Sequence, residues 1–254
     1  DLPDAAVMGF LAVAAAAGAS GTVSVGGSGS LWDIGGDLVV GGNGSGVLTL
    51  ADSGTVSTDR LTLAASGGSA GTLNIGAADG SSASAAGTLD SAIVAFGAGD
   101  GTIVFNHTDT AYRFGSTISG TGTILVAGGN TILTADNVNS GKTSISSGAG
   151  LQIGDGGTRG TLGGDIAVAG TLTFDRSDDI AFKGTVSGDG VLVKNGKGDL
   201  TLSADSSVFT GAANVNAGAL LVDGDLRGAT FDVASGAAVG GSGTIGDTLI
   251  RTGG

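Results

Sequence analysis

The chain has 254 residues, of which 53 are Gly and one is Pro, and all 23 acidic residues are Asp. Asp and Gly favour turns, so this composition argues against a helical protein. The net charge of −13 argues against a nucleic-acid partner, which needs a basic surface, and 41% hydrophobic residues argue against a disordered chain. Cysteine is absent, so disulfides are excluded.

The first apolar stretch is "AAVMGFLAVAAAA", residues 5–17. It resembles the core of a signal peptide, but the preceding "DLPD" is acidic, whereas a signal peptide has a basic leader. It is also too short to span a bilayer. We therefore expect it to form the first turn of the fold, and the start at Asp1 instead of Met indicates a fragment or a processed chain.

Short strand-like phrases recur along the rest of the chain. Each starts with Gly, alternates apolar with small or hydroxyl residues over roughly five positions, and ends at another Gly. Examples are "GTVSVGG" (21–27), "GVLTLADSG" (46–54), "GTLNIGA" (71–77), "GTILVAGG" (122–129) and "GALLVDG" (218–224). Alternation with a period of two predicts strands with one buried face, and the flanking Gly residues permit tight turns.

A longer repeat, which contains several of these short phrases, is also present. Residues 118–156 and 186–224 align with an offset of 68 to 70 residues. The aligned pairs are Gly120 with Gly188, Gly122 with Gly190, Asp136 with Asp205, and Gly141 with Gly211. We expect one solenoid over 1–254, in which 118–254 is the more regular region.

A strand of this length cannot bury its own apolar face, but stacked copies build a continuous core. A propeller and a parallel β-helix are the competing architectures. Propellers use antiparallel hairpins and blade-specific aromatic residues, whereas this chain has only ten aromatic residues and turns of varying length. The sequence therefore predicts an all-β, parallel β-helix with three strands per coil.

The phrases "KGDLTLSADSSVFTGAANV" (197–215) and "NAGALLVDG" (216–224) resemble the passenger-associated repeat of Gram-negative autotransporters. Phe209-Thr210-Gly211 stands where Tyr-Thr-Gly is usual, and two Ala residues replace the Gly-Thr that follows in the family. Three further stretches are similar to passenger patterns, in the order expected along such a chain: 27–57, 99–114 and 228–246.

The resemblance implies a right-handed parallel β-helix of the pertactin-like and AIDA-like adhesins. It implies export through the periplasm by type V secretion and display at the cell surface by the passenger's own C-terminal β-barrel translocator. The implied function is adhesion, self-association or biofilm formation, with host-surface molecules, extracellular-matrix molecules or sister passengers as partners. The two long repeats would aid secretion and folding. We interpret the chain as a segment near the C-terminal end of such a passenger.

Few residues suggest chemistry. His107 is the only histidine, and no Gly-x-Ser-x-Gly elbow followed by an acid and then a histidine is visible in a strand-turn-helix setting, so we expect a turn or coil-edge role for it. The densest charged cluster, Asp175, Arg176, Asp178 and Asp179, suggests the alternative function, a glycan-active β-helix lyase or hydrolase. Turn chemistry explains this cluster equally directly. We predict no catalytic residue and no cofactor.

Calcium and glycan binding are the remaining possibilities. The phrase "GGNGSGVLT" (41–49) approaches a calcium-binding repeat, but Gly46 stands where the Asp ligand is needed, so we predict no metal site. Trp32 and Tyr112 are candidates for stacking on a sugar, although a structural, buried role is commoner for a single aromatic residue. We expect Phe209 to pack at a repeat corner.

Overall fold

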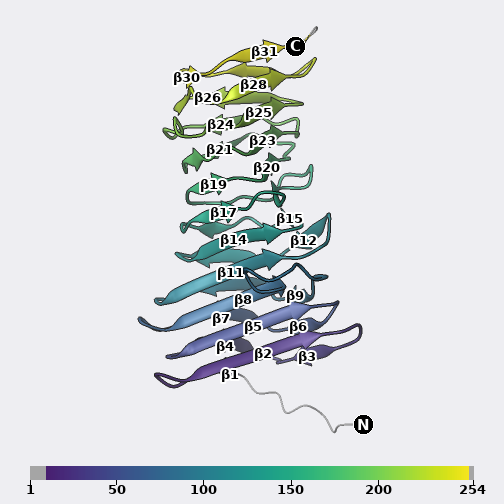
Figure 1. The fold of residues 1–254 in the computed structure, drawn as a ribbon, viewed down its shortest axis with the longest axis vertical. Helices are drawn as coiled ribbons and strands as arrows, with labels where there is room; N and C mark the ends of the chain where they lie inside the picture. Colours follow the sequence, from purple (N-terminus) through teal and green to yellow (C-terminus); the bar gives the residue numbers. More distant parts are fainter. Residues whose placement is uncertain (1–9, 252–254) are drawn as a thin grey trace. The chain divides into compact units, whose positions relative to one another are not determined.

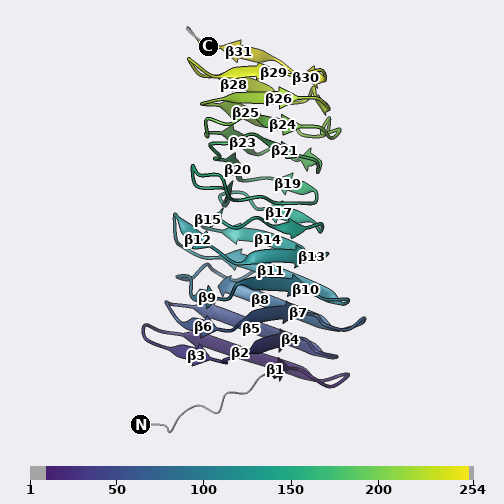
Figure 2. The same ribbon diagram turned by 180° about the vertical axis from the view of Figure 1, so that it is seen from behind.

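The computed structural model describes residues 10–251, which form β-strands and turns without a helix. The strands build a parallel β-solenoid of about 11 turns, so the predicted fold class is confirmed (Figures 1 and 2). No helix that could cross a membrane is found among these residues. Part of the predicted first turn, residues 5–9, lies outside the described residues. Residues 10–13 form the first strand.

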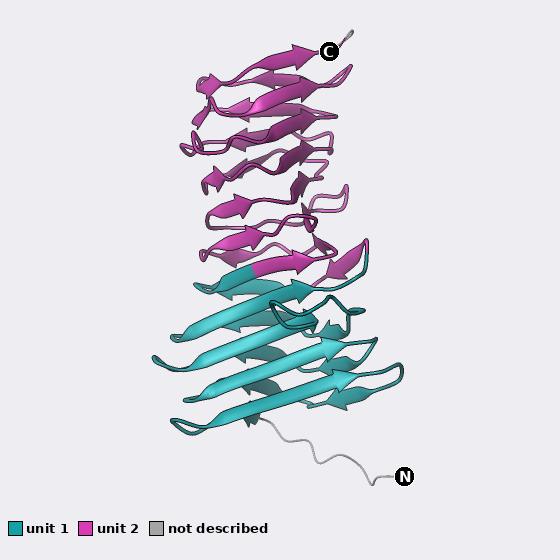
Figure 3. Cartoon of the chain, viewed as in Figure 1, with its two compact units in different colours: residues 1–109, 116–124 teal, residues 110–115, 125–254 magenta. Residues whose placement is uncertain are grey.

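The chain divides into two compact units, 1–109 with 116–124 and 110–115 with 125–254 (Figure 3). In the first unit every third strand pairs, so each coil contributes one strand to each of three sheets. The sheets are β1 (Phe10–Val13), β4 (Asp37–Val40), β7 (Arg60–Leu63), β10 (Ile93–Phe96) and β13 (Thr117–Gly120); β2 (Ser20–Gly26), β5 (Ser45–Ala51), β8 (Ala70–Gly76) and β11 (Asp100–Asn106); and β3 (Leu31–Asp33), β6 (Thr55–Ser57) and β9 (Thr88–Asp90).

The second unit is also built of parallel ladders, and β14 (Thr123–Gly128), from Leu125 on, and β16 (Val138–Asn139) lie near its start. Its ladders are β12 (Tyr112–Phe114), β15 (Asn130–Leu133), β18 (Gly150–Ile153), β20 (Thr171–Phe174), β23 (Val191–Lys194), β25 (Ala212–Val215), β28 (Thr230–Val233) and β31 (Thr248–Ile250); β17 (Thr143–Ile145), β19 (Ile166–Val168) and β22 (Val186–Ser187); β21 (Ile180–Phe182), β24 (Leu200–Leu202), β26 (Ala219–Val222) and β29 (Ala238–Gly240); and β27 (Asp225–Leu226) with β30 (Thr244–Ile245).

The alternating apolar residues form the core, as the period-two pattern predicts. Along β5, β8 and β11 the inward rows are aliphatic or aromatic, and Leu50, Ile75 and Phe105 are fully buried. Each coil thus buries the apolar face of the next one, which an isolated strand cannot do.

A row of glycines shapes one corner of the first unit. Gly21, Gly46, Gly71 and Gly101 pair in register along β2, β5, β8 and β11. A Cβ added at Gly71 would lie 2.2 Å from the carbonyl oxygen of Val40 and 2.3 Å from the amide nitrogen of Ala64. Glycine is therefore required there, because the backbone of the preceding strand passes too close for any side chain.

Candidate functional site: a pinned loop on the first unit

One corner of the first unit carries a long connection. The turn from the second to the third strand of a coil covers residues 27–30 after β2 and residues 52–54 after β5, but residues 77–87 after β8 (Figure 1). We call residues 77–87 the corner loop. Loops on a rigid scaffold are the usual place for binding residues, so this insertion is the first candidate for a functional surface.

The middle of the corner loop faces solvent. Asp79, Gly80, Ser81 and Ser82 are all exposed. Gly80 has a φ of +73°, a conformation that glycine adopts without strain. The exposed side chains are small and polar, which suits contact with another polar surface more than burial of an apolar ligand.

The end of β11 holds the loop from one side, through residues 105–109, which we call the anchor segment. The side-chain amide of Asn106, itself 4% exposed, donates hydrogen bonds to the carbonyl oxygens of Ala78 (2.8 Å) and Ser81 (2.9 Å). The amide of Thr108 donates to the carbonyl oxygen of Ser84 at 3.0 Å. The segment "FNHTD", which resembles a family phrase, therefore has a structural task here.

Asp109 of the anchor segment and the turn at 52–54 also hold the corner loop. The carboxylate of Asp109 accepts a hydrogen bond from the amide of Ala86 at 2.9 Å. In the coil on the other side, Asp52 and Ser53 donate their amides to the carbonyl oxygens of Ala85 (2.9 Å) and Ala86 (3.0 Å). The loop is thus fixed to two neighbouring coils of the same unit.

The turn that receives the loop is strained. Asp52 has a φ of +49° and Ser53 a φ of +67°, both in the left-handed region that disfavours residues with a Cβ. This conformation points both amides at the loop, because the same two residues donate the hydrogen bonds to it. The strain is consistent with a turn shaped to hold the loop in place.

His107 lies inside this corner. It continues the inward row of Ile103 and Phe105, and its side chain is fully buried. Its Nδ1 is 3.8 Å from Oδ2 of Asp109. Burial lowers the pKa of His107, and the nearby carboxylate of Asp109 opposes this effect. The position agrees with the expected coil-edge role, and a fully buried ring offers no surface to a substrate.

In the second unit, side chains of the predicted charged cluster at 175–179 form hydrogen bonds with neighbouring turns of the protein itself. Arg176 is 5% exposed, and its Nε and Nη2 each donate to the carboxylate of Asp178 at 2.8 Å. Its Nη1 donates to the carbonyl oxygen of Gly160 at 2.6 Å. Asp179 accepts the amide of Asp199 in the next coil at 2.8 Å. These contacts fit turn chemistry for Arg176, Asp178 and Asp179, since they occupy the three side chains with backbone groups and with each other.

Sequence reasoning missed two buried polar residues, Asn106 and Lys194. Lys194 takes an inward position in β23, where its neighbours in register are Phe174 and Val215. Its ammonium donates to the carbonyl oxygens of Gly196 and Ala217, the latter at 3.0 Å. Burial lowers its pKa against the effect of nearby aspartates. The alternation in "GVLVKNG" already places Lys194 on the buried face, so the signal was present in the sequence.

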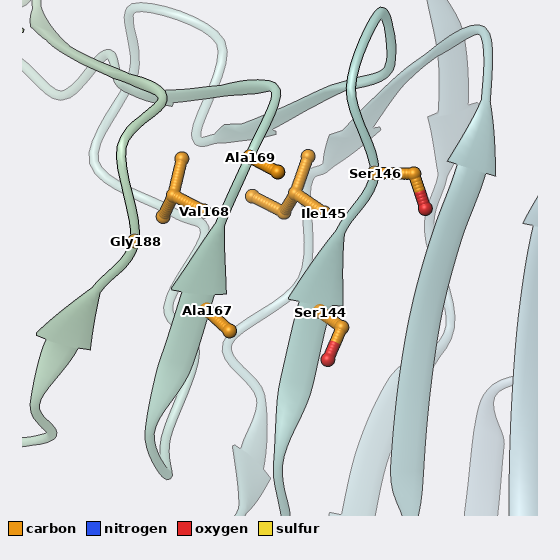
Figure 4. A pocket seen from close by; sticks show the side chains of 7 residues that line it. All are labelled: Ser144, Ile145, Ser146, Ala167, Val168, Ala169 and Gly188. Carbon is orange, nitrogen blue, oxygen red and sulfur yellow. The ribbon is translucent and has the colours of Figure 1, made fainter. Parts of the chain in front are cut away.

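Hollows on the described surface differ in the residues that line them. A hollow of about 280 Å³ on the second unit is lined by small and aliphatic residues: Ser144, Ile145, Ser146, Ala167, Val168, Ala169 and Gly188 (Figure 4). A hollow of about 340 Å³ in the same unit includes Asp175, Ser177, Asn195 and Lys197. In the first unit, a hollow of about 510 Å³ includes Asp33, Asp59 and Asp90.

The aromatic candidates and Gly46 lie at positions that contribute to the packing of the coils. Trp32 and Tyr112 are half-buried, and each pairs with a fully buried residue, Val56 and Thr131 respectively. Phe209 is fully buried in a turn closed by its amide and the carbonyl oxygen of Ser206, which confirms its corner position. Gly46 belongs to the glycine row. Among residues 10–251 no group of three or more acidic or histidine side chains is suited to hold a metal.

Two curated proteins are similar to part of this chain. The uncharacterized lipoprotein YdeK of Escherichia coli (strain K12) is 39% identical over 121 residues, which cover 44% of this chain and 9% of that protein. The adhesin BmaC autotransporter of Brucella suis biovar 1 (strain 1330) is 36% identical over 153 residues, which cover 51% of this chain and 4% of that protein. The matched region is thus under a tenth of either relative. No family model and no solved structure matches the chain.

Proposed function

We propose that this chain is a non-enzymatic segment of the passenger of an autotransporter adhesin. The observation that carries the proposal is the partial similarity to BmaC, whose name gives it as an adhesin and as an autotransporter. The similarity to a lipoprotein, also a class of exported protein, supports export. The parallel β-solenoid agrees with the fold that the passenger resemblance implies.

The use of charged side chains supports a binding role over an enzymatic one. An enzyme of the glycan-cleaving type needs a pair of carboxyl groups that are free to face the substrate. In the cluster at 175–179, Asp178 is paired with Arg176 and Asp179 caps the next coil. Acids elsewhere in the second unit do the same: Asp165 accepts the amide of Thr185 and Asp199 that of Ala219.

In this proposal the stacked coils form a stalk and the corner loop is the contact surface at the coil edge. Its partners are host-surface molecules, extracellular-matrix molecules or sister passengers. The two long repeats, 118–156 and 186–224, aid secretion and folding. The site of action is the cell surface.

A bead assay tests the proposal. The 254-residue chain is coupled to beads, and binding is measured to host cells, to matrix-coated plates and to beads that carry the same chain. The matched control replaces 77–87 with Asp-Ser-Gly, the sequence of the equivalent turn at 52–54. We expect saturable binding to at least one surface and its loss in the control. No binding to any surface, together with release of sugars from a polysaccharide panel, would instead support a glycan-active enzyme.

A further inference from the structure

The corner that holds the loop also contains the only histidine of the chain. Ser84 of the corner loop forms a parallel β-bridge with His107, so loop and anchor segment meet at this residue. The carboxylate of Asp109 lies between the two, 3.8 Å from the imidazole Nδ1 and 2.9 Å from the amide of Ala86. The imidazole and the docked loop therefore share one carboxylate.

We propose that protonation of His107 releases the corner loop from the anchor segment, so that the loop is closed at neutral pH and opens in acid. The closed form buries the imidazole completely, and an imidazolium in that place loses its hydration. Opening the corner returns water to the ring.

Burial, and not a neighbouring cation, favours the neutral form of the ring. The strands and turns at 45–57 and 70–109 contain no Lys or Arg. Asp109 is the acid that acts on His107, and its effect is smaller than that of burial. The other acids in these two stretches are Asp52, Asp79, Asp90 and Asp100.

The direction of the pH effect follows from linkage. The pKa of His107 is lower in the closed form than the ordinary value, which the ring regains when the corner opens. The closed form is therefore fully favoured above about pH 6.5 and loses stability as the pH falls below that value. At pH 5.5, one unit lower, the equilibrium constant for opening the corner is at most about tenfold larger than at neutral pH. The inference goes beyond the proposed function and does not depend on adhesion.

Hydrogen exchange of the full chain at pH 7.5 and 5.5 tests the proposal, with rates corrected for the intrinsic effect of pH. We expect the opening constant of the peptide that contains Ala86 to rise several-fold in acid, whereas peptides from β5 stay unchanged. The variant His107→Gln should show no such rise. A rise that persists in His107→Gln, or no rise in the wild type, overturns the proposal.

Two further measurements separate the histidine from its neighbour. Asp109→Asn keeps an oxygen that accepts the Ala86 amide but removes the charge that favours the imidazolium, so acid opening should be at least as large as in the wild type. Loss of acid opening in this variant would assign the effect to Asp109. Because His107 is the only histidine, NMR titration of the wild type gives its pKa directly, even where His107→Gln fails to fold. A value at or above about 6.5 overturns the proposal.

Discussion

Asn106 shows how a single polar side chain can determine the path of a loop. It follows the inward Phe105 in the alternation, so its side chain lies on the outer face of β11, yet it is 4% exposed because the corner loop covers it. Asn74 stands on the neighbouring strand, is equally buried, and donates to the hydroxyl of Thr49 at 3.0 Å. The two residues differ in that only Asn106 bonds the loop.

We predict that Asn106→Ala frees the corner loop without unfolding the unit. The substitution removes two hydrogen bonds, each with a net contribution of about 1 kcal/mol. Limited proteolysis should show faster cleavage within 77–87. Asn74→Ala is the matched control, and its loop should be cleaved at the wild-type rate. Equal cleavage of both variants and the wild type would mean that the other anchors hold the loop alone.

At the scale of the structural element, aspartates of the second unit connect one coil to the next. Asp165 and Asp179 accept backbone amides 20 residues further on, from Thr185 and Asp199. The repeat spacing has the same value, since Ile166 pairs with Val186. An acid placed before a strand thus reaches the equivalent place in the next coil, and the coil length of 20 residues sets which amide it meets.

Hydrogen bonds to carboxylates, within one turn or between coils, make the second unit sensitive to acid. The amide of Thr185 lowers the pKa of Asp165, and Arg176 lowers that of Asp178; Ser207, Arg227 and Arg251 do the same for Asp205, Asp225 and Asp232. Because the folded pKa lies below the ordinary value of about 3.9, the carboxylates stabilise the fold above that pH and lose this effect as the pH falls through it.

We therefore predict that the melting temperature of the chain falls between pH 5 and pH 3, and that an acid protease cleaves at sites in 125–251 at pH 3 that it does not cleave at pH 5. Asp165→Asn keeps an acceptor for the Thr185 amide but cannot titrate, so its melting temperature should depend less on pH in this range. A melting temperature that stays constant from pH 5 to pH 3 would contradict the prediction.

At the scale of the whole molecule, stability comes from stacking, so each coil depends on its neighbours. Leu202 is 3% exposed in β24, between two paired strands, whereas Val23 in β2 is half-buried. We predict that Leu202→Asp costs on the order of 4 kcal/mol, since it removes a core side chain and places a charge in the apolar interior. Val23→Asp should unfold only local coils.

Limited proteolysis measures both effects. The wild type should leave a resistant C-terminal fragment that contains 186–224, and Leu202→Asp should lose it while Val23→Asp retains it. A resistant fragment from the N-terminal half would show that the C-terminal repeats do not anchor folding, and their similarity to a transport-assisting repeat would then carry no functional meaning.

We predict further that metal ions do not support the fold. A chelator should shift the melting temperature by no more than about two degrees, because a stabilising ion would act through mass action and residues 10–251 hold no group of three or more acidic or histidine side chains suited to a metal. Differential scanning calorimetry with and without chelator checks this. A large decrease that Ca²⁺ reverses would reveal a site in the Gly-Asp turns.

The sequence by itself determined the repeating unit. Alternation such as "VLTL" at 47–50 reports which face of a strand is buried, because alternation is a local property of the backbone. The absence of Glu and the scarcity of Pro agree with strands and turns. These local rules were enough to predict a parallel solenoid with three-strand coils.

Only the tertiary structure decided which residues meet across coils. Asn106 and Ala78 are 28 residues apart, and their contact depends on the length of each turn and on the path of the corner loop. The same holds for Arg176 and Gly160, and for His107 with Ser84. A sequence pattern gives the period of a coil, but the distance between two turns is set by how the coils stack and where a loop folds back, which no local preference specifies.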